Sequence, residues 1–278
     1  MIAAARWLLA ALALAAGVAA ADAPRRVASV GGAVSEIVIA LGAEDRLVAV
    51  DTTSVYPERL KSLPQMGYMR SLSAEGVLAM RPDLVLASSD AGPPTALAQL
   101  RATGVPVVML SPEHSLAALR RNVQTVADAL GIPEQGRALD ARLDAEWRTA
   151  QRNLPPPAQR PRVLFVLART GNALLVSGEG TAADAMIRLA GGSNALAGVQ
   201  GYKPLTPESA ATAAPDVILV TREGLANVGG ASRLTAQSGL DLTPAGKANR
   251  VVAMDALYLL GFGPRLPEAV RDLATALR

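Results

Sequence analysis

Residues 72–86 read LSAEGVLAMRPDLVL, and residues 205–219 read LTPESAATAAPDVIL. The two stretches lie 133 positions apart, counted between Glu75 and Glu208 (208 − 75 = 133). Each predicts a helix that begins at a hydroxyl residue, then a Pro-Asp turn, then a short apolar strand. A unit that recurs once, at domain-sized spacing, predicts two similar lobes. Small ligands bind preferentially between domains, so the repeat also predicts a ligand cleft.

The segments around this repeat alternate between strand and helix patterns. Strand patterns occupy residues 26–30, 47–50, 84–87, 105–110, 162–167, 217–220 and 250–254. Helical patterns separate them, which predicts an α/β fold of two Rossmann-like lobes with central, mainly parallel sheets. Residues 134–153 form a helical pattern of about 20 residues, or roughly 30 Å, with Gly136 as the one breaker. The prolines at 155–157 end it. We interpret it as one long backbone helix joining the lobes; the alternative is an ordinary helix within one lobe.

The first residues have the pattern of a secretory signal peptide. Arg6 precedes an apolar run at 7–18, and small residues at 19–23 offer cleavage sites. The run is short for a membrane anchor, which is the alternative. We therefore predict a signal peptide at 1–21, an N-terminal lobe at 22–132, a connecting helix at 133–157 and a C-terminal lobe at 158–278. The chain has no cysteine, so we expect a periplasmic protein without disulfides or a lipid anchor.

Composition argues against several classes of function. The 27 basic and 24 acidic residues give a formal net charge of +3 without a basic tract, which disfavours nucleic acid as a partner. Phosphate-loop and dinucleotide fingerprints are missing from the sequence, as are Cys/His clusters typical of metal sites. The only histidine is His114, outside any nucleophile elbow, so we do not expect an enzyme.

Residues 51–57, which read DTTSVYP, contain the sharpest candidate site. They follow a predicted strand, at the edge where parallel sheets place ligands. Tyr56 precedes a proline and should be extended. Its phenolate would be a hard oxygen donor for ferric iron, and tyrosine is a known axial ligand of haem. The residues alone leave open a second interpretation, in which the ring packs the loop and the hydroxyl caps a backbone group.

The chain resembles the haem-binding periplasmic proteins of bacterial haem ABC importers. These belong to the helical-backbone class of substrate-binding proteins, with the cobalamin and ferric-siderophore binders. The resemblance covers essentially the whole mature chain and rests on residues 51–57, 67–76, 91–94, 181–187, 201–205 and 260–265. Its most specific portion, TSVYP at 53–57, implies that Tyr56 is the axial ligand of the haem iron.

The resemblance further implies that haem is the transported ligand and that a permease dimer in the inner membrane receives it. An outer-membrane uptake system is a candidate partner upstream, and we expect a monomer. A cobalamin or ferric-siderophore receptor is the alternative within the class. A periplasmic enzyme that uses the cleft for haem or metal chemistry is the alternative outside it.

Haem also carries two propionates, which need cationic partners. The candidates lie after predicted strands or beside the repeated Gly-Tyr motif, and arginine is the better carboxylate partner. An arginine could also hold the Tyr56 oxygen as phenolate. Tyr68 and Tyr202 occupy matching places in the repeat and either stack on the porphyrin or support the following turn. The cationic candidates, each with a solvated surface charge as its alternative, are Arg70, Arg169, Lys203 and Arg222.

Glu75 and Glu208 occupy equivalent helices of the two lobes. In similar binding proteins such carboxylates dock onto the permease, where rim charges steer the encounter. The alternative is a role in a helix cap that begins at Ser71 or Thr206. Some relatives use a second-lobe histidine on the other haem face. Since His114 lies in a first-lobe loop, we expect no axial histidine, which argues against two bound haems.

Overall fold

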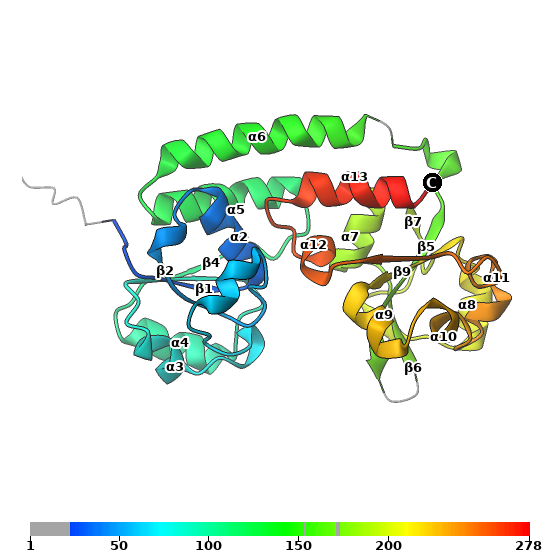
Figure 1. Cartoon of the computed structure of the whole chain (residues 1–278), viewed down its shortest axis with the longest axis horizontal. Coiled ribbons are helices and arrows are strands. Elements are labelled where there is room, and N and C mark those ends of the chain that lie inside the picture. Colours follow the sequence, from blue (N-terminus) through cyan, green and yellow to red (C-terminus); the bar gives the residue numbers. More distant parts are fainter. Residues whose placement is uncertain (1–22, 153, 171–172) are drawn as a thin grey trace, which may run out of the picture.

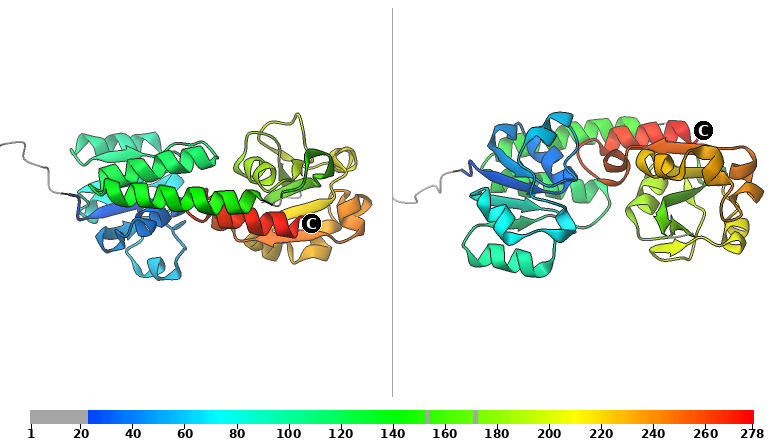
Figure 2. Two further views of the ribbon diagram at one scale, coloured as in Figure 1. Left: turned by 90° about the horizontal axis from the view of Figure 1, so that it is seen from above. Right: turned by 60° about the horizontal axis from the view of Figure 1, so that its bottom comes forward.

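The computed structural model describes residues 23–152, 154–170 and 173–278, so the predicted signal peptide at 1–21 lies outside the described residues. Two α/β lobes lie side by side, and one long helix, α6 (Pro133–Gln151), runs across both of them (Figure 1). The C-terminal helix α13 (Leu266–Ala276) packs along α6 (Figure 2). The predicted fold class is confirmed. The connection is more than a single rod, because α13 packs against α6.

The first lobe is built on a parallel sheet with the strand order β2-β1-β3-β4. Its two central strands are buried along their whole length, as apolar strands covered on both faces should be. The strands are β1 (Val27–Val30), β2 (Leu47–Val50), β3 (Leu84–Ala87) and β4 (Val107–Met109). The helices are α2 (Gly32–Ala40), α3 (Ala74–Ala79), α4 (Pro94–Ala102) and α5 (Leu116–Ala129).

The second lobe has a mixed sheet with the order β10-β9-β5-β6-β8. β5, β9 and β10 are parallel, as predicted, but β6 and β8 add an antiparallel edge, and the short β7 pairs with β5. The strands are β5 (Arg162–Thr170), β6 (Ala173–Ser177), β7 (Ser193–Asn194), β8 (Tyr202–Pro204), β9 (Val217–Thr221) and β10 (Val251–Met254). The helices are α7 (Ala182–Leu189), α8 (Pro207–Ala213), α9 (Arg222–Val228), α10 (Ala231–Thr235), α11 (Pro244–Lys247) and α12 (Ala256–Leu260).

The sequence repeat corresponds to a structural repeat. Ser73 caps α3 and Thr206 caps α8, each by accepting a backbone N–H in the first turn, so Ser71 is not the cap. The aspartate of each Pro-Asp turn then accepts the N–H at the start of the lobe's central strand. Asp83 accepts from Arg26 at 2.9 Å, and Asp216 accepts from Arg162 at 2.8 Å.

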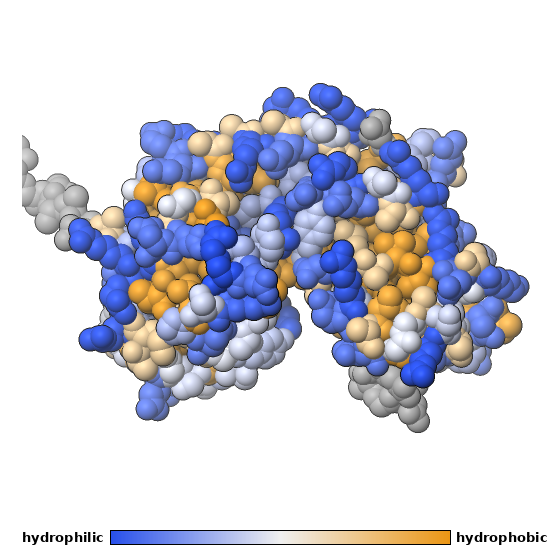
Figure 3. Space-filling model, in the orientation of Figure 1, coloured by the Kyte–Doolittle hydropathy of each residue, from blue (hydrophilic) through white to orange (hydrophobic). Residues whose placement is uncertain are grey.

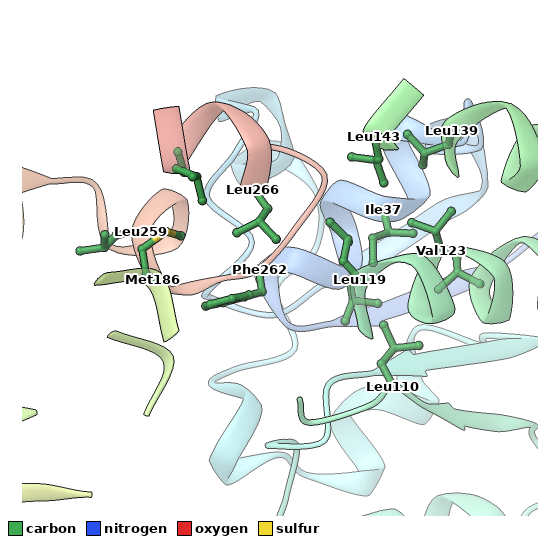
Figure 4. Close-up of a cluster of buried hydrophobic side chains, with 14 of the residues drawn as sticks. Ile37, Leu110, Leu119, Val123, Leu139, Leu143, Met186, Leu259, Phe262 and Leu266 are labelled. Atoms are coloured by element: carbon green, nitrogen blue, oxygen red, sulfur yellow. The ribbon is translucent and has the colours of Figure 1, made fainter. Parts of the chain in front are cut away.

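One hydrophobic core continues through the joint between the lobes. It includes Ile37 of α2 and Leu143 of α6, together with Met186 of α7 and Leu266 of α13 (Figure 4). Phe262, from the connection between α12 and α13, lies between the two groups (Figure 4). Because burial of apolar area is favourable at about 25 cal/mol per Å², this shared core resists separation of the lobes.

Candidate functional site

Below the joint, the two lobes are separated by a deep notch that opens to solvent (Figure 3). The loops after the parallel strands of the first lobe lie at its border, since two of them interact with residues of the second half of the chain. His114, after β4, contacts Phe262, and Arg70 acts electrostatically on Tyr202. The notch is therefore formed at the carboxyl ends of the strands, where α/β proteins bind ligands.

The candidate segment at residues 51–57 begins with a network of hydrogen bonds around Asp51. Asp51 is fully buried, and its carboxylate accepts hydrogen bonds from the N–H of Gly31 at 2.8 Å and of Thr53 at 3.0 Å, and from the Ser54 hydroxyl at 3.0 Å. The Thr53 hydroxyl in turn accepts from the Gly32 N–H at 2.9 Å. These polar residues tie the loop to the N-terminus of α2. The most specific part of the motif thus serves largely to hold the loop.

Tyr56 is 47% exposed and lies against an arginine from the far end of the chain. The Arg265 guanidinium is 3.6 Å from the centroid of the Tyr56 ring and 5.0 Å from that of Tyr258. Arg265 also donates to both carboxylate oxygens of Glu36, at 2.6 and 2.8 Å. Glu36 is only 6% exposed, and burial raises its pKa although Arg265 opposes the shift. Tyr56 is therefore part of the contact between α2 and the C-terminal segment.

The cavity beside Tyr56 is small. It has a volume of about 240 Å³ and lies between Tyr56, α2, α6 and the segment that begins α13. Ligand pockets usually enclose about 300–1,000 Å³, so this cavity is below the usual range for a small molecule. A porphyrin would have to meet the ring from the notch rather than from this cavity.

Tyr68 has a different environment. It is 42% exposed, and its hydroxyl accepts a hydrogen bond from Nη1 of Arg70 at 2.8 Å. Nη2 of Arg70 donates to Asp90, in the loop after β3. Burial lowers the pKa of Arg70, but the hydrogen bonds to Asp90 and Tyr68 outweigh it and raise the pKa. The oxygen of Tyr68 therefore has a positively charged donor at hydrogen-bonding distance.

Tyr202 faces this group from the second lobe. Burial raises its pKa, while a hydrogen bond with Thr181 and the positive charge of Arg70 act in the opposite direction. The charge of Arg70 acts on Tyr202 although the two residues belong to different lobes. Tyr68 and Tyr202 are both exposed and belong to opposite lobes, and the choice between stacking and supporting the turn stays a prediction.

The remaining cationic candidates are spread over the second lobe. Lys203 is exposed and follows Tyr202 in β8, so the two side chains point to opposite faces of the sheet. Arg222 is exposed at the first residue of α9, directly after β9. Arg169 belongs to β5, and its side chain lies outside the part of the chain that the structure describes. Of the four, Arg70 alone has described contacts that bring it to a tyrosine oxygen.

The His114 side chain packs against another aromatic ring. Its ring meets that of Phe262 edge-on, with centroids 5.0 Å apart. Burial lowers its pKa, and the charge of Asp90 opposes the shift. The described residues contain no cluster of three or more His, Cys, Asp or Glu side chains that could hold a metal ion. In the described ranges there is also no helix with the length and hydrophobicity to cross a bilayer.

Glu75 and Glu208 are exposed in the first turns of α3 and α8. Neither glutamate is a member of a capping box. The capping box of α8 is formed by Thr206 and Ser209. Hydrogen bonds from its own backbone and from Thr206 lower the pKa of Glu208. Both side chains are exposed, but that of Glu208 also takes part in the cap of its helix, so the capping and docking roles can coexist there.

Sequence comparison agrees with this architecture. The family model described as periplasmic binding protein matches residues 27–258. The chain belongs to this family. The resemblance noted from the motifs is thereby confirmed. Proteins of this family are components of transport systems rather than enzymes.

Solved structures extend the comparison. The binding protein is 52% identical to the periplasmic haem-binding protein BhuT in complex with two haems, with a TM-score of 0.87 over 91% of this chain and 97% of the other. It is 45% identical to the haem-binding protein RhuT from Roseiflexus sp. RS-1 in its apo form, with a TM-score of 0.85 over the same shares. It is also 30% identical to a vitamin B12-binding protein of Yersinia pestis (strain Pestoides F), over 72% of this chain and 71% of that protein.

Proposed function

We propose that the protein captures haem between its two lobes and delivers it to an ABC permease. The observation that carries this proposal is a notch between the two lobes (Figure 3) together with exposed tyrosines on both lobes, one of them hydrogen-bonded to an arginine. Flat aromatic rings suit the faces of a porphyrin, and phenolate suits ferric iron. The 52% and 45% identical structures are both haem-binding proteins, which supports haem over other cargo.

Two phenols compete as the iron ligand. Tyr56 was expected from the sequence, and its role stays a prediction. Exposure does not separate it from Tyr68, since the two residues are 47% and 42% exposed. The surroundings of the two hydroxyl groups differ. The hydroxyl of Tyr68 accepts a hydrogen bond from Arg70, whereas Arg265 stacks on the ring face of Tyr56. We therefore favour Tyr68 as the axial ligand, with Tyr202 on the facing side.

Delivery requires a contact with the membrane subunits. Glu75 and Glu208 are exposed on equivalent helices, one in each lobe, as a permease of two subunits would require. We propose that they dock onto basic groups of such a permease dimer. A cleaved signal at 1–21, a periplasmic location without a lipid anchor, a monomeric state and an upstream outer-membrane uptake system complete the proposal. Arg70, Arg169, Lys203 and Arg222 remain the candidate propionate partners.

A titration separates haem from the alternative cargo. The purified protein is titrated with hemin, cyanocobalamin or a ferric hydroxamate siderophore, and the visible spectrum and tyrosine fluorescence are followed. We expect hemin alone to saturate, and the break point gives the number of haems per chain. The 30% identical vitamin B12-binding protein makes cobalamin the runner-up. Saturation by cyanocobalamin at a lower concentration than hemin would overturn the proposed cargo.

A further inference from the structure

Asp90 occupies a position that the proposed function has not used. The Arg70 guanidinium is forked between two partners: Nη1 donates to the Tyr68 oxygen and Nη2 to the carboxylate of Asp90. Asp90 comes from the loop after β3, whereas Tyr68 and Arg70 come from the segment before α3. The three residues therefore meet only because the two loops are held together.

The backbone fixes these two loops to each other. The N–H of Leu72 donates to the carbonyl of Gly92 at 2.8 Å, and the N–H of Gly92 donates to the carbonyl of Met69 at 2.8 Å. Asp90 is two residues from this pair of bonds, and Arg70 is one residue from Met69 and two from Leu72. Since the backbone is fixed on both sides, the carboxylate offers the guanidinium a stationary anchor.

An anchor is needed because the arginine is half exposed. The side chains of Arg70 and Asp90 are 54% and 52% exposed, so water competes for the guanidinium. A long side chain loses rotamer entropy when it is held, and a second hydrogen bond to a fixed group reduces that loss per bond. With Nη2 occupied by Asp90, Nη1 stays directed at the phenol oxygen.

We propose that Asp90 is a positioning residue that holds Arg70 on the oxygen of Tyr68, and so stabilises the iron ligand. This inference rests on the proposed function and on Tyr68 as the ligand. The sign of the effect distinguishes positioning from simple electrostatics. A carboxylate near a phenolate repels it, so a purely electrostatic role predicts tighter haem binding when the negative charge is removed. Positioning predicts weaker binding when the anchor is removed.

Two variants separate these effects. Asp90→Ala removes both the charge and the anchor, whereas Asp90→Asn removes the charge but keeps a carbonyl oxygen that Arg70 can reach. Asp140→Asn is the matched control, because Asp140 of α6 also accepts hydrogen bonds from an arginine, Arg120 of α5, away from Tyr68. All three aspartate variants change exposed or part-exposed side chains, so folding should be preserved.

Two measurements are made on each variant. In the haem-free protein, the ¹³Cζ resonance of Tyr68 reports the hydrogen bond to its oxygen, and the four tyrosines of the chain allow assignment by single Tyr→Phe changes. In the ferric haem complex, the rate of haem transfer to apomyoglobin reports ligand strength. We expect Asp90→Ala to shift the Tyr68 resonance and accelerate haem loss about tenfold, the scale of an outer-shell partner. Asp90→Asn should restore most of both, and Asp140→Asn should change neither.

The outcomes are distinguishable. An unshifted Tyr68 resonance in Asp90→Ala would overturn the inference, whether or not the protein binds haem. Slower haem loss in both Asp90 variants would also overturn it, because the carboxylate would then act only as an opposing charge. If the resonance moves as expected but the wild-type protein takes up no hemin, the positioning of Tyr68 stands and the proposed function fails.

Discussion

Replacing Tyr68 by phenylalanine is expected to remove the phenolate-to-iron charge-transfer band of the ferric haem complex and to weaken haem binding severely. The ring, and with it any stacking, is kept, but the oxygen that would bind iron is lost. Loss of an outer-shell partner typically costs about 10- to 100-fold in metal affinity, and loss of the ligand itself should cost more. Visible spectroscopy and hemin titration of the variant measure both effects.

Tyr56→Phe is the matched control for this prediction. It removes the phenol oxygen of a similarly exposed tyrosine but leaves the ring that Arg265 covers. We expect its haem complex to keep the charge-transfer band and an affinity within a few-fold of wild type. The reverse pattern, with the band lost only in Tyr56→Phe, would restore the ligand expected from the sequence and contradict the preference for Tyr68.

Replacing Glu36 by alanine is expected to destabilise the protein by about 3 kcal/mol or more, the range measured when one partner of a buried ion pair is removed. Arg265 would lose both hydrogen bonds from its Nε and Nη2 atoms, and its side chain is only 21% exposed. The contact joins residues 229 positions apart, between α2 and the C-terminal segment, so its loss also loosens the joint. Urea unfolding followed by circular dichroism measures the change.

An exposed pair provides the comparison. Arg59 and Glu44 form the same two-pronged contact, but their side chains are 59% and 34% exposed. Surface pairs contribute about 0–1 kcal/mol, so Glu44→Ala should have little effect. Replacing both members of the buried pair, Glu36→Leu with Arg265→Met, should recover much of the loss, because no charge is then left unpaired. Equal losses for Glu36→Ala and Glu44→Ala would show that the buried contact is unimportant.

Burial raises the pKa of Glu36 in spite of its partner, which indicates that desolvation of the carboxylate outweighs the attraction of Arg265. A pair of this kind adds little net stability compared with apolar residues, but it tolerates few other geometries. We interpret it as a contact that fixes how the lobes meet, and therefore how wide the notch is. The stacking of Arg265 on Tyr56 makes this tyrosine part of the same contact.

Much of the fold was predictable because local signals agreed with the tertiary structure. Strands β2 and β3 have the predicted bounds, and the repeated Pro-Asp turns occupy equivalent places in the two lobes. The antiparallel edge of the second lobe was not predicted. β8 is three residues long, exposed throughout and contains a proline, so it carries no apolar pattern. The short helices α9 to α12 were also missed, since periodicity is read over windows of about 11–18 residues. The equally short α3 and α8 were found because the sequence repeat marks them.

The candidate site was predictable only in part. Tyrosine as the candidate residue type, and Arg70 as a candidate cleft cation, were proposed from spacing and family resemblance, and both stay predictions. The choice between Tyr56 and Tyr68 depends on residues that are distant in sequence. Arg265 stacks on Tyr56, and Asp90 binds Arg70, the arginine beside Tyr68. The sequence did contain a signal for the ion pair of Glu36. Glu36 is the single carboxylate in the apolar helix sequence GAVSEIVIA, and a lone buried charge requires a partner.

The central claim is that ferric haem lies between the lobes with its iron bonded to a tyrosine oxygen. Anomalous diffraction at the iron absorption edge, from crystals grown with hemin, tests it most directly, because it places the metal without reference to the porphyrin density. We predict an iron peak in the notch, at bonding distance from the hydroxyl oxygen of Tyr68. A peak outside the notch, or one that is not at bonding distance from a tyrosine oxygen, would contradict the account.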